Sequence, residues 1–508
     1  MRKFLLASCL ALLAATPAAA EWREAQTEHF IIYSESEPAR IEQLAERLES
    51  YDGLMRKATG VGADQAVKVR IYEVADTGTI ERALGESNTG IAGFYNSNSF
   101  GPFLVTPRKT ANAGRYFTPE LVLQHEYAHH FMLQYLPAIY PSWYVEGFAE
   151  LIGSSMPMPD GRIGYGMPAK HRGNNILSDW IPLQELLTRE QITYLDTYGQ
   201  GWAVTHFLTF DVGRAQLLRR YLAELGAGKP MAEAARVFGD LGKLNSQART
   251  YVGAGSFAYR PVKVDIRRPI IQASRVLSPA EAALVPQMIA FRDDELSTIR
   301  KASDRSREDR LRRINLQRVR EVAARFPNDV AATHFLSVAE RTAGNDAAAL
   351  AAANRVLALR PDHTGALVQK SLLLSQSAAA LQGPLRQAAA AEARALAVRA
   401  NKANNDDPMA LVAYYQSFSL AGAKPTPAAM RGLVRAVELL PNDTVIRQLL
   451  VDRLAAEGQW AAAMSILQPV ANSPHRSPRR DAAREQMAKL QAALAAATPA
   501  TTEARAGS

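Results

Sequence analysis

The sequence predicts two structural parts, an α+β domain followed by an all-α domain of helical repeats. Three observations support this division. Alternating apolar residues and one amphipathic helix pattern occupy about the first 110 residues, two helix patterns rich in histidine and glutamate follow, and proline-containing junctions recur through about the last 200 residues. With 508 residues and 47% hydrophobic content, the chain is long enough for two or three domains with their own cores.

Residues 1–20 have the features of a secretory signal peptide. Arg2-Lys3 precede an apolar run from Phe4 to about Ala15, and small residues lead to Glu21. A lipoprotein signal ending at Cys9 is the alternative, but it would leave an apolar core of only about five residues, shorter than usual. We therefore expect a periplasmic or secreted protein. No later stretch reaches about eighteen apolar residues, so we expect no transmembrane segment in the mature chain.

Cysteine content and charge exclude two further classes of site. Cys9 is the only cysteine, so removal of the signal peptide would leave no thiol for a disulfide or for metal ligation. The formal net charge is +9, but the basic residues are spread over arginine-rich helix patterns instead of being interleaved with aromatic residues. We therefore expect no nucleic-acid partner.

Alternation and helical periodicity predict the elements of the α+β part. Residues 27–34 and 67–72 have strand patterns, and 38–59 has an amphipathic helix pattern between them. Two short β-rich runs at 91–95 and 103–106, separated by asparagine, serine and glycine, predict a hairpin.

The next helix pattern carries the residues with the most distinctive chemistry. Thr118, Pro119 and Glu120 form a strong helix start, with a capping hydroxyl, a proline in the first turn and an acid near the N-terminus. His125 and His129 follow, four residues apart on the apolar face, so both imidazoles can reach one metal ion. Glu126 lies one step round the helix, where a carboxylate can take a proton from a metal-activated water.

A third ligand and its support are predicted on the following helix pattern, between Pro141 and Gly153. A zinc ion in a hydrolase takes three protein ligands and leaves one position open. Glu146 follows His129 after sixteen residues, and Glu150 lies one turn further on, both among apolar residues. Two buried carboxylates at this spacing repel each other unless cations balance them. We therefore predict Glu146 as the third zinc ligand and Glu150 as the acceptor that orients a ligand histidine.

These two helix patterns contain the motifs His125-Glu126-x-x-His129 and Trp143-x-x-Glu146-Gly147-x-Ala149-Glu150. The pair resembles the gluzincin metallopeptidases, the superfamily of thermolysin-like and aminopeptidase N-like enzymes. The resemblance implies a zincin-like metallopeptidase domain over residues 21–255, with an edge strand that can pair with an extended peptide. In thermolysin-like members, the acid four residues after the third ligand orients a ligand histidine, which matches Glu150. The aminopeptidase N signature G-x-M-E-N is absent, so recognition of a free amino terminus is not implied.

Two residues beyond the motifs are candidates for stabilising an oxyanion. Tyrosine and histidine donors perform this task in metallopeptidases. Tyr198 and His206 lie in an apolar helix pattern after the two motifs, and they qualify by residue type and by position. The alternative for each is a structural role, as a core side chain or a satisfied polar contact. The sequence leaves open which of the two acts.

The rest of the chain divides into a connector, repeats and a tail. Residues 256–310 are predicted to be a connector, first β-like and then densely charged. Prolines 327, 361, 408 and 441 mark junctions separated by 34, 47 and 33 residues, and the longer step carries an insertion. A period of about 34 residues is typical of tetratricopeptide repeats, which we predict over 311–494. Such arrays bind peptides or proteins, although an array that only stabilises the first domain is also possible. Residues 495–508 are predicted to be disordered.

Two classes of function follow. The first is an exported zinc metallopeptidase that hydrolyses peptide bonds with Glu126 as base, and whose repeats bind a protein substrate or partner. The alternative is a tetratricopeptide scaffold or adaptor whose peptidase-like domain is inactive or only binds metal. A zinc hydrolase acting on a non-peptide amide would have the same motifs. Cleavage specificity and oligomeric state are not predicted.

Overall fold

The computed structural model describes most of the chain from residue 21 onward. The described ranges are 21–62, 67–85, 91–98, 100–110, 116–136, 140–173, 176, 180–189, 197–292, 302–472 and 478–497. The predicted signal peptide and most of the predicted tail lie outside these ranges. None of the described helices is both long enough and apolar enough to cross a membrane.

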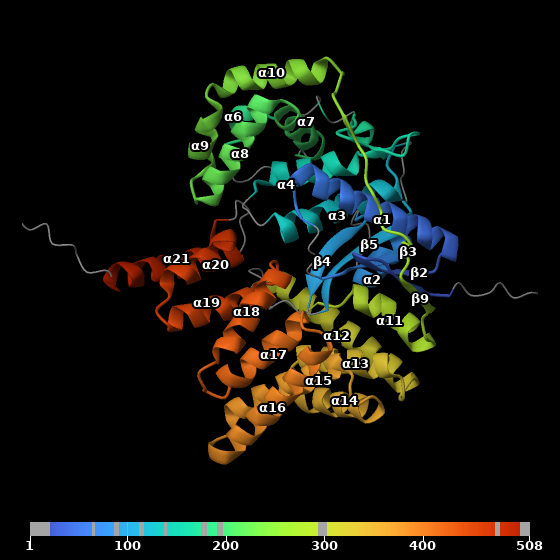
Figure 1. The fold of residues 1–508 in the computed structure, drawn as a ribbon, viewed down its shortest axis with the longest axis vertical. Helices are drawn as coiled ribbons and strands as arrows, with labels where there is room; N and C mark the ends of the chain where they lie inside the picture. Colours follow the sequence, from blue (N-terminus) through green and yellow to red (C-terminus); the bar gives the residue numbers. More distant parts are fainter. Residues whose placement is uncertain are drawn as a thin grey trace, which may run out of the picture.

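A six-stranded mixed sheet forms the centre of the N-terminal part (Figure 1). Its strand order is β4-β5-β3-β2-β1-β9. The central strands β5, β3 and β2 are parallel, whereas β4, β1 and β9 pair antiparallel with their neighbours. The bounds are β1 (Arg23–Gln26), β2 (Phe30–Ser34), β3 (Val69–Asp76), β4 (Phe94–Asn98), β5 (Gly101–Lys109) and β9 (Ala273–Val276).

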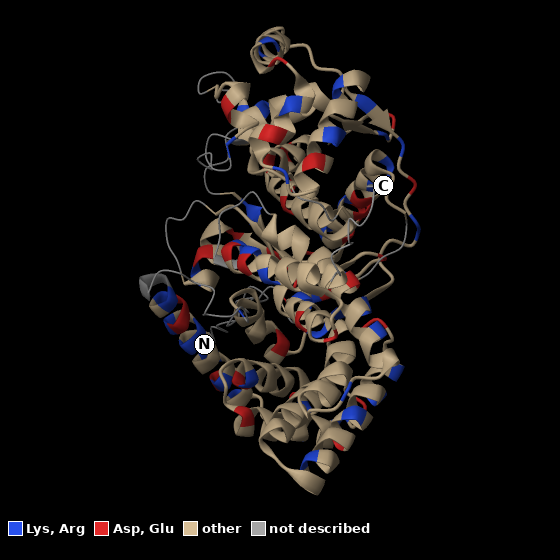
Figure 2. Ribbon diagram, turned by 90° about the vertical axis from the view of Figure 1, so that its left-hand side faces the viewer, with Lys and Arg blue, Asp and Glu red and all other residues tan. Residues whose placement is uncertain are grey.

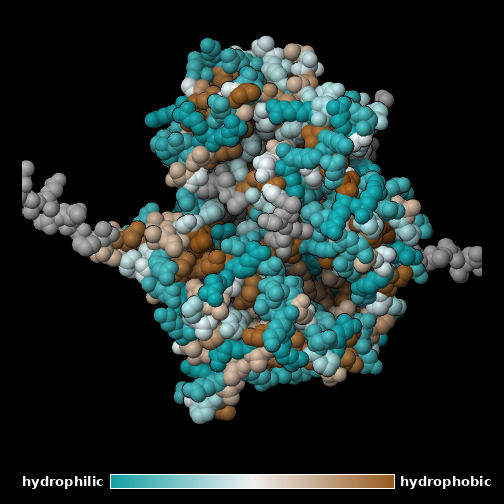
Figure 3. Space-filling view, in the orientation of Figure 1, coloured by the Kyte–Doolittle hydropathy of each residue, from teal (hydrophilic) through white to brown (hydrophobic). Residues whose placement is uncertain are grey.

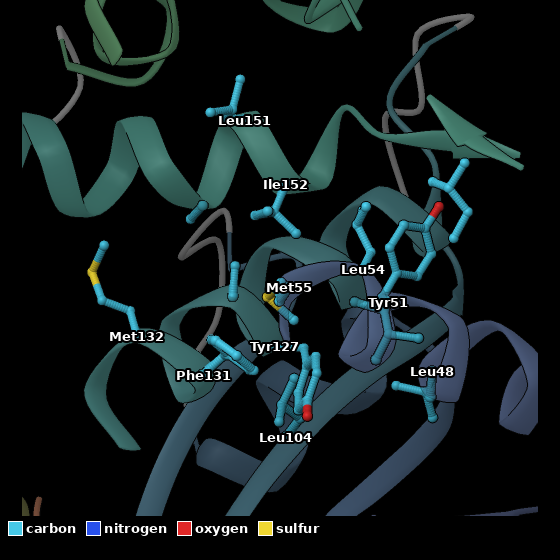
Figure 4. Packing of buried hydrophobic residues seen from close by; sticks show 14 of the residues in the cluster. Leu48, Tyr51, Leu54, Met55, Leu104, Tyr127, Phe131, Met132, Leu151 and Ile152 are labelled. Atoms are coloured by element: carbon cyan, nitrogen blue, oxygen red, sulfur yellow. The ribbon is translucent and has the colours of Figure 1, made fainter. Parts of the chain in front are cut away.

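Helices cover both faces of this sheet. Helix α1 (Pro38–Thr59) runs from β2 to β3, and this crossover is why those strands can be parallel. It ends where Gly60 adopts φ 77°, a left-handed conformation that favours glycine. Helices α1 and α3 (Pro119–Tyr135) share one core with the sheet, and α2 (Thr77–Leu84) and α11 (Pro279–Ile289) pack on the other face. Figure 4 shows the first core, where α1, α3, α4 (Ser142–Gly153) and β5 meet.

The predicted strands, helix and hairpin of this part are all present, and the hairpin is β4–β5. The prediction missed β1 and α2, which are too short to show a clear period. A layered α and β arrangement is therefore established for the N-terminal part, while the finer assignment to a zincin-like fold stays a prediction.

A second layer of helices follows the two motif helices and has its own core around the fully buried Trp143. The sequence also predicts helices near residues 215–225 and 231–238, and both segments are helical, whereas the last helix of the layer was not predicted. The elements are α6 (Leu183–Leu186), α7 (Thr197–Thr209), α8 (Val212–Gly226), α9 (Met231–Ala234), η3 (Ala235–Phe238) and α10 (Leu241–Gly253).

The predicted connector contributes to the first domain more than its sequence suggested. Strand β9 pairs with β1 at the edge of the large sheet. Strand β8 (Arg260–Val262) completes a small antiparallel sheet with β6 (Met156–Pro157) and β7 (Ile163–Tyr165). Strands β8 and β9 lie in the segment that the sequence predicted to be β-like, but they are short and largely exposed, and the sequence did not assign them to a sheet. The chain between the domain and the repeats is thus partly built into both sheets.

The C-terminal part is an array of consecutive helices that pack on their sequence neighbours (Figure 1). The helices are α12 (Ala302–Arg325), α13 (Val330–Thr342), α14 (Asp346–Leu359), α15 (Thr364–Ala380), α16 (Gly383–Ala403), α17 (Pro408–Ser419), α18 (Pro427–Leu439), α19 (Thr444–Ala456), α20 (Trp460–Ala471) and α21 (Pro478–Ala497). This arrangement confirms tetratricopeptide-like helical repeats. Residues 495–497, which were assigned to the tail, belong to α21.

The recurring junctions are helix boundaries with a common chemistry. Asp329, Asp407 and Asp443 each cap the following helix through a side-chain oxygen that accepts a backbone N–H. His363 does the same through Nδ1 at the remaining junction. The step of 47 residues contains α15 and α16, which have 17 and 21 residues. The insertion therefore lengthens one helix pair and does not interrupt the array.

The repeats pack against the N-terminal part at several places. Phe100, at the tip of the β4–β5 hairpin, packs against the rings of Phe291 and Phe335, with centroid distances of 5.6 and 5.5 Å. The side chain of Gln134 on α3 donates to the carbonyl of Leu439 at the end of α18, at 3.1 Å. Basic and acidic residues are interspersed along the helices in Figure 2, and hydrophilic residues cover most of the face in Figure 3.

Candidate metal centre

Two helices bring the predicted metal ligands together. Helix α3 begins where predicted, with the Thr118 hydroxyl accepting the Leu121 N–H at 3.3 Å. It carries His125 and His129 on the side that faces α4, and α4 carries Glu146 one helix away. The three ligand atoms all lie within 4.8 Å of one another.

The spacing of these atoms matches a tetrahedral metal site. His125 Nε2 lies 3.1 Å from His129 Nε2 and 3.2 Å from Glu146 Oε2, and the remaining pair is 3.6 Å apart. A tetrahedral zinc ion with bonds of about 2.0–2.1 Å holds its ligand atoms about 3.3–3.4 Å apart. The two imidazole nitrogen atoms and the carboxylate oxygen are mostly buried, and the distances between them fit the coordination of one zinc ion.

The charges around the three candidate ligands shift the pKa values of His125 and His129 in opposite directions. Burial lowers the pKa of His125, but its hydrogen bond to Glu146 and the nearby carboxylates outweigh burial and raise that pKa to about 9. Burial and the neighbouring charge of His125 lower the pKa of His129 to about 4. The carboxylates around the two histidines therefore favour a positive charge at this position. A divalent cation would supply that charge.

Glu126 lies beside the three candidate ligands, and a hydrogen bond from the sheet holds its carboxylate. Its Oε2 accepts the backbone N–H of Tyr95 in edge strand β4, at 3.0 Å. Burial, followed by the charge of Glu146, raises its pKa against the opposing effect of His125. A carboxylate that is fixed from one side and easier to protonate than usual has the properties of a proton acceptor.

Glu150 is completely buried and is surrounded by three cationic or ionisable partners. Its Oε1 lies 3.5 Å from His125 Nδ1, on the side of the ring away from the cluster. Its Oε2 contacts His171 Nε2 at 2.6 Å, and Arg172 donates to Oε1 from Nε and Nη2 at 3.0 and 2.7 Å. Burial alone would raise the pKa of Glu150, but His171, His125 and Arg172 lower it to about 2.

His171 and Arg172 were missed by the sequence analysis. They lie on the short helix η1 (Lys170–Arg172), after a loop without helical or strand periodicity. The only signal in the sequence was indirect, because a buried carboxylate at Glu150 requires a cation nearby, but nothing in the sequence places that cation.

The two candidate oxyanion donors lie in different surroundings. The Tyr198 ring is 5.8 Å from the His125 ring, and the Arg172 guanidinium lies over it at 4.5 Å from its centroid. His206 is buried elsewhere on α7, where Nε2 contacts the carbonyls of Gly166 and Ala258 at 3.0 and 2.9 Å. Because carbonyls only accept, Nε2 carries the proton, and since burial lowers the pKa of this ring, Nδ1 accepts the hydroxyl of Tyr251.

These contacts place the Tyr198 ring beside His125, one of the three candidate ligands, and occupy both ring nitrogens of His206 with protein partners. The role of His206 in an oxyanion site stays a prediction that its contacts do not favour. His130, on the same helix as the ligands, is buried against Tyr127 and Tyr95 and has its pKa lowered to about 3 by burial.

Comparison with known proteins gives only low-scoring similarities to solved structures. No family model matches the chain, and no curated protein matches it. The chain is similar to the crystal structure of a thermophilic tetratricopeptide repeat protein from Thermus thermophilus, with a TM-score of 0.31 and 17% identity over 36% of this chain and 91% of that one. It is also similar to a tetratricopeptide repeat protein from Parabacteroides merdae, with a TM-score of 0.29 and 14% identity over 42% and 78% of the two chains.

Proposed function

We propose that the protein is a zinc-dependent hydrolase that cleaves peptide bonds and that its helical repeats bind a protein substrate or partner. The observation that carries the proposal is the spacing of His125, His129 and Glu146, which suits one tetrahedral ion. The resemblance of the two motifs to gluzincin metallopeptidases supports it, and export across a membrane is part of the same proposal.

The chain's own residues divide the chemistry among them. A bound zinc ion would supply a Lewis acid for the carbonyl oxygen and would lower the pKa of a coordinated water. Glu126 is placed to accept the proton of the attacking water and to pass it to the leaving nitrogen. The hydroxyl of Tyr198 is the candidate donor to the oxygen that becomes negative.

The helical repeats favour a second candidate function, that of a scaffold whose N-terminal part binds metal without hydrolysis. An array of helix pairs provides an extended surface for peptides or proteins whether or not the chain is an enzyme. The two candidates differ in one measurable respect, since only the first requires turnover.

Metal removal tests the proposal. The chain from residue 21 is expected to purify with about one zinc ion per molecule and to cleave an unfolded protein substrate. Treatment with a chelator should abolish cleavage, and added zinc should restore it. The Glu146→Ala variant should hold little zinc because two ligands remain. A wild-type chain that binds zinc at this site but cleaves none of a broad set of proteins would favour the scaffold, and one that binds no zinc would contradict the ligand assignment.

A further inference from the structure

We propose that Arg172 and His171 are positioning residues of the metal centre. They clamp the buried carboxylate of Glu150, which fixes the His125 ring, and Arg172 also holds the ring of Tyr198. This inference rests on the proposed function and extends it to residues that neither motif contains.

The first step of the argument is the geometry around Glu150. This carboxylate has no exposed surface, and both of its oxygens are engaged by η1. Arg172 donates from both Nε and Nη2 to Oε1, while His171 contacts Oε2, so the two residues together fix the orientation of the carboxylate. His171 has only 3% of its side chain exposed and holds the second oxygen.

The second step leads from Glu150 to the metal ligand. Glu150 Oε1, the oxygen that Arg172 binds, is also the one 3.5 Å from His125 Nδ1. A carboxylate behind a ligand imidazole selects the tautomer with a proton on Nδ1, so that Nε2 presents its lone pair to the metal. Without the clamp, Glu150 would be free to turn away from His125. The contact between Glu150 and His125 is long, so its orientation depends on what holds the carboxylate from the other side.

The third step concerns the other end of Arg172. Its guanidinium stacks on the Tyr198 ring at 4.5 Å, and that ring in turn lies beside His125. One side chain thus touches both the group that orients a ligand and the candidate oxyanion donor. His171 contacts Glu150 but is not in contact with Tyr198 among the described ring contacts. The two residues are therefore separable by experiment.

Zinc affinity is the first measurement, made by competition with a chelator on the full mature chain. The Arg172→Met variant is expected to bind zinc about 10–100-fold more weakly than wild type, the usual effect of removing a residue that supports a ligand. Arg172→Lys should lie between the two, because an ammonium keeps the charge but lacks the paired donors. Arg162→Met is the matched control: Arg162 lies in the same segment, is exposed and pairs only with Asp160 among its described contacts, so its affinity should equal wild type.

A double-mutant cycle separates positioning from a general loss of folding. In a Glu150→Ala background the clamp has no side-chain acceptor, so adding Arg172→Met should weaken zinc binding no further. Equal affinity of Arg172→Met and wild type would overturn the inference, as would additive effects in the cycle. If Arg172→Met does not fold, Arg172→Lys decides by the same comparison. Absence of zinc from the wild type would overturn the proposed function itself, whereas normal zinc in every variant would overturn only the clamp.

Turnover at saturating zinc tests the contact with Tyr198. Arg172→Met is expected to lower kcat by about 10-fold or more with little change in KM, because the misplaced donor acts in the transition state. His171→Gln should weaken zinc binding but leave kcat near wild type once the site is filled. Equal kcat values for the two variants at saturating zinc would contradict a role for Arg172 at Tyr198.

Discussion

The Glu126→Gln variant is expected to lose at least about 100-fold in kcat and to keep its zinc. Glutamine has nearly the same shape, and its side-chain oxygen can still accept the Tyr95 N–H, so the site should not rearrange. It cannot take a proton, and a general base contributes about 10²- to 10⁴-fold to the rate. The measurement is kcat on a protein substrate together with the zinc content of the same preparation.

The control is a second glutamate-to-glutamine substitution on α3, at Glu120. Glu120 lies in the first turn of α3 and pairs with Arg47 at 2.7 Å, about a third exposed and away from the metal cluster. Glu120→Gln should keep both zinc and activity, with at most a small loss of stability from a partly exposed ion pair. Full activity in Glu126→Gln would remove Glu126 from the mechanism even if zinc remained essential.

Replacement of Gly147 by alanine is expected to be the most damaging change outside the cluster. Gly147 on α4 faces Gly201 on α7, where the two helix backbones cross in contact. An added Cβ would overlap Thr205 Oγ1 and the Gly201 carbonyl oxygen and would lie 2.6 Å from the Gly201 carbonyl carbon. Because these are mostly backbone atoms, the helices themselves must separate, at a cost of about 1–3 kcal/mol or more. Glu146 and Glu150 flank this crossing and Tyr198 lies on the partner helix, so zinc binding should weaken as well.

Thermal unfolding and zinc affinity, compared with a glycine in open surroundings, test this expectation. Gly253 is the last residue of α10, is exposed and has nothing within 4 Å of an added Cβ. Gly253→Ala should be neutral or slightly stabilising, since alanine loses less entropy on folding. A Gly147→Ala protein that melts at the wild-type temperature and binds zinc normally would show that α4 and α7 can move apart without cost.

The parts of the site that the sequence predicted are those encoded locally. A spacing of four residues places His125 and His129 on one helix face regardless of the rest of the fold, and Thr118 caps that helix where expected. Glu146 was found because a short apolar helix must satisfy its buried carboxylate. In the repeats, each junction caps a helix within three residues of itself, so local sequence was again sufficient.

The missing parts depend on contacts between distant segments. The clamp on Glu150 comes from residues 21 and 22 positions further along the chain, and strand β9 pairs with a strand about 250 positions before it. No periodic pattern in the sequence indicates which distant segments meet in either contact. His206 was a candidate by residue type and by its place in an apolar helix, with a structural role as the alternative. Its contacts with two carbonyls and a tyrosine fit that alternative, and no local rule connects those partners to it.

The hairpin β4–β5 contacts both parts of the molecule. The same hairpin supplies the amide that holds Glu126, and its tip is inserted among aromatic residues at the start of the repeats. A chain cut near residue 255 would lose strand β9 and would leave Phe100 in water. The repeat array and the N-terminal part therefore cannot be exchanged as independent modules. Any replacement array would have to reproduce the aromatic contacts of Phe100 before it could pack on this hairpin.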